Sequence, residues 1–189
     1  MRRVIRAFDH WLSRRLGIFT FSQADDCILR LAYGLAPDNI ETADFQVEKG
    51  SPVVFLHLWN EHLPPYTGLD DSLVWAALAT RQLRSSLGLA ARYLLGDPRF
   101  NGVRAVMGVT ALFSPPRHPG DPHPMEHFGF TVLPYHSPLG KFGEFWENFY
   151  SWMVLYAYSP ASFHDSHLFS LRRTVICIEA GEFMRRYGA

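Results

Sequence analysis

The chain has 189 residues, of which 48% are hydrophobic and 19% charged, so it predicts one globular domain with a sizeable core. Its 18 basic and 18 acidic residues balance, which argues against a nucleic-acid binder. No window approaches the ~20 apolar residues needed to span a bilayer, and no signal peptide is visible. The two cysteines, Cys27 and Cys177, lie in apolar surroundings and are expected to be buried reduced thiols, so a cytoplasmic protein is expected.

The N-terminal segment predicts a basic amphipathic helix (residues 1–18) ahead of a single domain (residues 19–189). Apolar residues recur there at three- and four-residue spacing, and five arginines accompany one aspartate. Three roles are open for this helix: docking on its own core, lying on the inner face of an anionic membrane, or filling a groove of a partner protein. The residues that would contact a membrane or partner are Arg2, Arg3, Arg6, Phe8, Trp11, Arg14 and Arg15.

The segment from residue 50 to 65 is the strongest strand signal. It starts with turn residues and runs through six apolar residues interrupted by one histidine, which predicts a central strand covered on both faces. Residues 27–35 predict a strand, or a short helix because Arg30 interrupts one face, and residues 44–48 predict a short edge strand. Asp70 or Asp71 would cap a long helix that reaches about Leu95.

The second half alternates strands and helices. Strands are expected over residues 103–113, 128–133 and 172–178, and a closing helix over 179–187. Ser137-Pro138 favours a helix start, and the apolar stripe that follows is expected to face the core or to wall an apolar pocket. The members of that stripe are Phe142, Phe145, Trp146, Phe149, Trp152, Met153 and Tyr156.

These elements predict an α+β fold in a single domain. We expect a mixed, mostly antiparallel sheet of about four to five strands, with two long helices packed on it and the amphipathic helix at the N-terminus.

Polar side chains gather where the central strand would end. A buried polar group without a partner costs ~1–3 kcal/mol, so these residues need either internal hydrogen bonds or a ligand. Both interpretations are open, and so is an enzyme that uses Glu61 and a histidine as general acid and base. The candidate ligand-binding residues are His57, Trp59, Asn60, Glu61, His62 and Thr110.

No cofactor or metal site is expected. The chain has no Walker loop, dinucleotide fingerprint, nucleophile elbow or Cys-x-x-Cys pair. His164 and His167, with Asp165 between them, could supply two metal ligands, but a zinc site needs three or four that converge.

Several short segments resemble the YkoP-like domain family over about residues 20–189. They are His57-Leu58-Trp59-Asn60, Leu83 with Leu89-Ala90, Gly108-Val109-Thr110, Phe128-Gly129-Phe130 and the closing Tyr187-Gly188. The family has no settled activity, so the resemblance implies no catalytic residues. Some relatives are joined to polysaccharide-deacetylase domains, which implies an accessory domain with a polar glycan or lipid ligand in cell-envelope metabolism.

Overall fold

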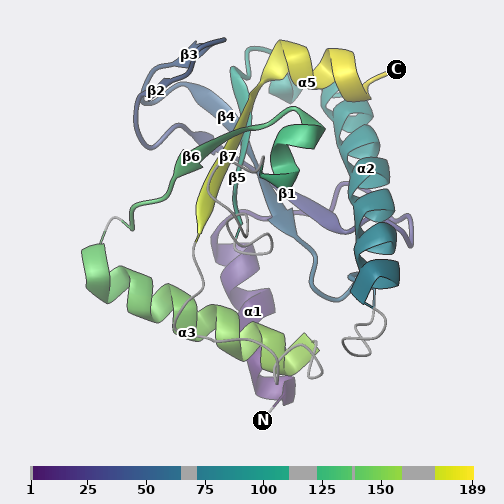
Figure 1. Ribbon diagram of the computed structural model, residues 1–189, viewed down its shortest axis with the longest axis vertical. Helices are drawn as coiled ribbons and strands as arrows, with labels where there is room; N and C mark the ends of the chain where they lie inside the picture. Colours follow the sequence, from purple (N-terminus) through teal and green to yellow (C-terminus); the bar gives the residue numbers. More distant parts are fainter. Residues whose placement is uncertain (1, 65–71, 111–122, 138, 159–172) are drawn as a thin grey trace.

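The computed structural model describes residues 2–64, 72–110, 123–137, 139–158 and 173–189 (Figure 1). Its strands are β1 (Leu29–Leu35), β2 (Ile40–Glu41), β3 (Gln46–Val47), β4 (Pro52–Leu58), β5 (Ala105–Thr110), β6 (Thr131–Pro134) and β7 (Thr174–Glu179). Its helices are α1 (Arg2–Arg15), α2 (Ser72–Gly96), α3 (Gly140–Tyr158) and α5 (Ala180–Tyr187), and its 3-10 helices are η2 (Pro98–Phe100) and η3 (Pro124–Phe128).

A mixed five-stranded sheet, in the order β1-β4-β5-β7-β6, forms the centre of the fold. The neighbouring strands β4 and β5 are parallel, and parallel strands need a crossover connection, which α2 provides here. The other three pairs, β1 with β4, β5 with β7 and β6 with β7, are antiparallel. The predicted α+β class, the mixed sheet and the interior position of β4 are therefore confirmed.

One face of the sheet carries the main core, which α2 and α5 cover. Leu31 and Val54 are fully buried there against Leu87 of α2 and Phe183 of α5. The hydroxyl of Ser86, also fully buried, accepts a hydrogen bond of 2.9 Å from the backbone N–H of Ile28 and so joins α2 to the chain entering β1. This face is apolar because β-branched and leucine side chains alternate toward it along each strand.

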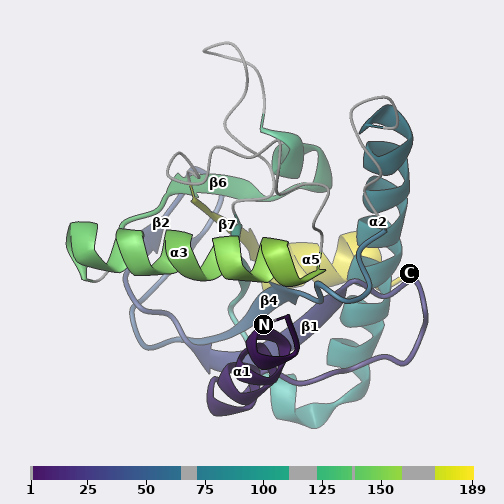
Figure 2. The same ribbon diagram turned by 90° about the horizontal axis from the view of Figure 1, so that it is seen from below.

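The opposite face of the sheet is covered in two parts. At one end the small β2–β3 hairpin covers Val53, Ala105 and Met107, and it buries its own Ile40 and Val47 against them. At the other end, where β4 and β5 finish, lie α1 and α3 (Figure 1). In the view from below, α1 is seen nearly along its axis, and α3 runs lengthwise across the picture beside it (Figure 2).

The fold class is confirmed, and α3 differs from the expected arrangement in two details. Long helices were expected to pack on the sheet, and α2 does, but α3 packs chiefly against α1. The aromatic stripe of α3 was expected in the core, yet Phe142, Phe145, Trp146 and Phe149 are exposed. The side of α3 that is buried carries the smaller residues Val154 and Ala157, because α1 offers α3 little apolar surface.

Some predicted boundaries shift for local reasons. The central strand ends at Leu58 and not at residue 62, because Asn60–His62 form a turn in which the N–H of His62 donates to the carbonyl of Trp59. Strand β6 begins at Thr131, since η3 occupies the preceding residues and ends at Gly129 in the left-handed conformation. The expected caps at Asp70 and Asp71, the loop from 115 to 122 and the histidines His164 and His167 lie outside the described residues.

Candidate functional site

The polar residues after β4 hold one another in a compact turn. The rings of Trp59 and His62 stack with their centroids 3.7 Å apart. The Glu61 carboxylate accepts a bond of 3.3 Å from Trp59 Nε1, and its other oxygen lies 3.4 Å from Nε2 of His10 in α1. Three of the predicted residues therefore form one cluster, to which α1 contributes a histidine.

A pair of side chains, one buried and one half-buried, lies just before this turn, on the sheet itself. Arg30 of β1 and His57 of β4 are cross-strand partners. Both lie on the face opposite the main core, because they alternate with residues that face α2. Burial, and secondarily the Arg30 charge, lowers the pKa of His57 to about 4, so its imidazole is neutral at pH 7.

Arg30 has an unusual environment for a charged residue. Only 9% of the residue is exposed, and its Nε has no hydrogen-bond partner. Among the described residues, no carboxylate oxygen lies within 4.0 Å of its guanidinium nitrogens. Buried charges are normally paired, so an arginine that contacts no described carboxylate is an exception in this fold.

Near this pair, a buried carboxylate of α1 joins α1 to α3. Asp9 of α1 is 6% exposed and accepts hydrogen bonds from Tyr150 and, at 3.1 Å, from Tyr158, both on α3. Burial, together with the Asp9 charge, raises the pKa of each tyrosine well above its usual value, so both remain hydrogen-bond donors. Asp9 is therefore committed to the tyrosines, and it forms no ion pair with Arg30.

The other candidate residues are placed less closely. Asn60 lies half-buried in the turn. His62 Nδ1 is buried and has no hydrogen-bond partner. Thr110, at the end of β5, lies four residues after Val106 and therefore on the same face of the sheet, the one that α2 covers. His57 lies on the opposite face. The structure thus brings His57 and the Trp59–His62 turn to the same end of β4 and separates Thr110 from them.

A second arginine, the partly buried Arg173, has a structural role in this fold. Arg173, before β7, donates to Asn148 and, at 2.8 Å, to Ser151, and one of its nitrogens lies 3.7 Å from Glu147 Oε2. The other Glu147 oxygen accepts bonds from Tyr135 and Ser137. These contacts tie α3 to the sheet. Arg173 is paired with a carboxylate, whereas Arg30 meets none in the described ranges of the chain.

Helix α1 buries a narrow and partly polar stripe of Ile5, Asp9 and Ser13. Its apolar residues Val4, Phe8, Trp11 and Leu16 are exposed. All seven residues predicted to contact a membrane or partner are exposed, namely Arg2, Arg3, Arg6, Phe8, Trp11, Arg14 and Arg15. Within the described parts of the chain, no helix combines the length and apolarity needed to cross a bilayer.

A shallow groove between α2 and α5 is basic but differs from the Arg30 site. It is lined by Arg81, Arg84, Arg92 and Arg186, with Ser85, Gly88 and Tyr187. All four arginines are exposed, and Arg186 pairs with Glu182. Charges in open solvent are strongly screened, so an anion would gain little there.

Sequence reasoning missed three residues of the site: Arg30, Asp9 and Tyr150. A lone arginine inside an otherwise apolar strand is a signal that could have identified Arg30, because burying an arginine is costly. Nothing in the local sequence pairs Asp9 with a tyrosine 141 residues away.

Fold and site together define an α+β domain in which a buried arginine, at one end of the sheet, forms no ion pair with a described residue. The chain belongs to the YkoP domain family, whose model matches residues 38–187. The match begins after β1, so α1 and Arg30 lie outside it. Neither the curated proteins nor the solved structures contain a match to this chain.

Proposed function

We propose that this chain is an accessory binding domain that holds the anionic group of a small polar ligand at Arg30 and His57. The observation that carries the proposal is the Arg30 guanidinium, nine-tenths buried and without a counter-ion among the described residues. An unpaired buried charge costs several kcal/mol, and a protein tolerates that cost most readily where a ligand offsets it. The ligand would carry a carboxylate or phosphate, the groups that a guanidinium binds through two parallel hydrogen bonds.

The residues around Arg30 would complete the site. Neutral His57 offers one N–H donor and one acceptor nitrogen. The Trp59–His62 stack supplies an aromatic wall, and the half-buried Asn60 amide can bond a sugar hydroxyl. A ligand that combines a charged group with hydroxyls fits this set, which favours a glycan or lipid precursor of the cell envelope.

We infer that the domain acts in the cytoplasm, at the inner face of the membrane. The support is chemical: Cys27 and Cys177 are both free and buried, and free thiols are typical of a reducing compartment. The link to cell-envelope polysaccharide or lipid metabolism is supported by the family resemblance.

The proposal can be tested by ligand-dependent thermal stability. The probes are acetate, inorganic phosphate, a sugar 1-phosphate and a nucleoside diphosphate sugar, each against wild type, Arg30→Met and Arg84→Met. Arg84 is the matched control because it is an exposed arginine of the α2–α5 groove. We expect at least one probe to raise the Tm of wild type and Arg84→Met but not of Arg30→Met. If every probe shifts Arg30→Met as much as wild type, or shifts neither, Arg30 is not a ligand site.

The alternative function is an enzyme that uses Glu61 and a histidine as general acid and base. The contact of Glu61 with His10, with both side chains partly exposed, favours it. His57 suits this role less, because a base with a pKa of about 4 accepts protons weakly at pH 7. Incubation of the same probes with wild type and Glu61→Gln, followed by mass spectrometry, separates the two functions: turnover lost in Glu61→Gln indicates the enzyme, and no turnover supports binding alone.

A further inference from the structure

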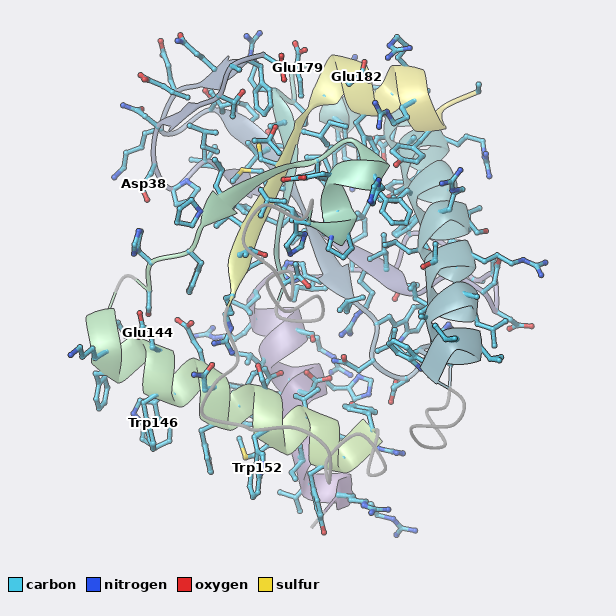
Figure 3. The ribbon with its side chains drawn as sticks, in the orientation of Figure 1. Asp38, Glu144, Trp146, Trp152, Glu179 and Glu182 are labelled. Atoms are coloured by element: carbon cyan, nitrogen blue, oxygen red, sulfur yellow. The ribbon has the colours of Figure 1, made fainter. Side chains whose placement is uncertain are left out.

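The outer surface of α3 carries a continuous row of exposed aromatic side chains. Phe142 is 67% exposed, Trp146 50%, Phe145 48% and Phe149 37%. Neighbouring rings touch along the row, with centroid separations between 5.5 Å and 6.4 Å. Trp146 and Trp152 extend from the side of α3 that faces away from the sheet (Figure 3). An exposed apolar row of this size marks an interaction surface.

Helix α1 extends this surface. Phe8 and Trp11 are 45% and 56% exposed, and their rings stack on each other with centroids 5.8 Å apart. Phe8 also meets the ring of Tyr150 on α3, with centroids 6.3 Å apart, so the apolar residues of the two helices adjoin. Both helices lie at the end of the molecule opposite α5 (Figure 1).

The exposed charges that α1 brings to this aromatic surface are basic, whereas α3 carries the exposed Lys141 and Glu144. None of the five arginines of α1 forms an ion pair with a described residue. Two of them lie over aromatic rings, Arg2 over Tyr156 at 5.2 Å and Arg6 over Tyr158 at 5.0 Å. The acidic residue of α1, Asp9, is buried by its tyrosines and does not offset them at the surface.

We propose that α1 and α3 together form a docking surface for an anionic lipid membrane. Exposed tryptophan and phenylalanine beside unpaired arginines are the residues that interfacial helices use, with rings at the acyl boundary and guanidinium groups at lipid phosphates. Lipid is favoured over a folded partner because the aromatic row projects from a convex helix: lipid chains accommodate such a ridge, whereas a protein would need a matching groove. This surface goes beyond the proposed ligand site and does not depend on Arg30.

Co-sedimentation of the full chain with vesicles tests the proposal. The vesicles are phosphatidylglycerol mixed with phosphatidylcholine, and phosphatidylcholine alone. We expect wild type to bind the anionic vesicles, to bind the neutral ones weakly, and to be released as salt rises toward ~1 M, where screening is nearly complete. The double variant Phe142→Ala/Trp146→Ala should lose about tenfold in partitioning. Its matched control is Leu35→Ala/Leu95→Ala, which removes two residues, each 60% exposed, from other surfaces and should bind like wild type.

A second pair of variants tests the contribution of the arginines to vesicle binding. Arg3→Ala/Arg14→Ala should weaken binding to anionic vesicles by about thirtyfold, since each basic residue near a charged surface contributes ~1 kcal/mol. Arg81→Ala/Arg92→Ala, in the α2–α5 groove, should leave it unchanged. All four variants alter exposed side chains, so unchanged circular dichroism and Tm are expected.

Three results would overturn the proposal. The first is that wild type does not sediment with anionic vesicles, and the second is that the control variants lose as much vesicle binding as the α1 and α3 variants. The third is that wild type binds no lipid but self-associates with rising concentration, and that Phe142→Ala/Trp146→Ala abolishes this self-association. The last result would identify the surface as an interface between copies of the chain.

Discussion

Arg30 and His57 lie opposite each other in the β1–β4 register, so a permanent cation sits beside an imidazole that is neutral at pH 7. The guanidinium adds to the effect of burial, and together they lower the pKa of His57 to about 4. This pair makes the stability of the domain depend on pH and on the identity of residue 30.

Stability should fall as the pH drops from about 6.5 to about 4. In that window the unfolded chain protonates His57 while the folded chain does not, because the folded pKa is the lower one. Stability from this group is fully present above pH 6.5 and is lost as pH falls through the folded pKa, by about 3 kcal/mol at most. Urea unfolding of wild type and His57→Gln across this range measures the effect. The free energy of unfolding of wild type should fall relative to that of His57→Gln as the pH drops; parallel curves would contradict the shift.

Replacement of Arg30 and of Arg173 by methionine should change the free energy of unfolding in different ways. Arg30→Met removes an unpaired charge and should leave the free energy of unfolding unchanged or raise it by about 1 kcal/mol. Arg173→Met leaves Glu147 without its cation and should lower it by about 3 kcal/mol. Urea titrations of both variants at pH 7 make the comparison. Equal destabilisation would mean that Arg30 is structural.

The hydrogen bond from Tyr150 to Asp9 should hold α1 against α3. Tyr150→Phe keeps the ring but removes a donor to a buried carboxylate, which costs ~1.5–3 kcal/mol for a charged acceptor. Hydrogen exchange followed by mass spectrometry should show faster exchange in α1 and unchanged exchange in α2. Tyr33→Phe, on the exposed part of β1, is the control and should change neither helix. Uniform acceleration in both helices would indicate global destabilisation.

Gly129 should tolerate no side chain. Its φ of 80° is in the left-handed region, and a Cβ there would lie 2.0 Å from Arg186 Nη1. Gly129→Ala should therefore lose ~1–2 kcal/mol from the backbone alone. Gly181→Ala, in α5 where nothing lies within 4 Å, should instead gain ~0.5–1 kcal/mol from helix propensity. Thermal unfolding of both variants gives the comparison, and a neutral Gly129→Ala would contradict the predicted backbone cost at this position.

Much of the fold followed from local patterns. The apolar run from 52 to 58 predicted an interior strand, and the three- and four-residue spacing predicted α1 and α2 within a few residues of their bounds. Patterns of this kind depend on the chain's own geometry, in which side chains alternate along a strand and recur every 3.6 residues around a helix. Where a turn intervened, as at Asn60–His62, the strand ended earlier than its composition suggested.

The sequence by itself determined the elements, the α+β class and the polar end of β4. Only the tertiary structure decided that the aromatic stripe of α3 faces outward, that Asp9 meets two tyrosines, and that Arg30 lies apart from every described carboxylate. Periodicity states which side of a helix is apolar, but what covers that side depends on contacts between distant segments. The bond from Arg6 to the carbonyl of Ala157 spans 151 residues, and no local pattern encodes it.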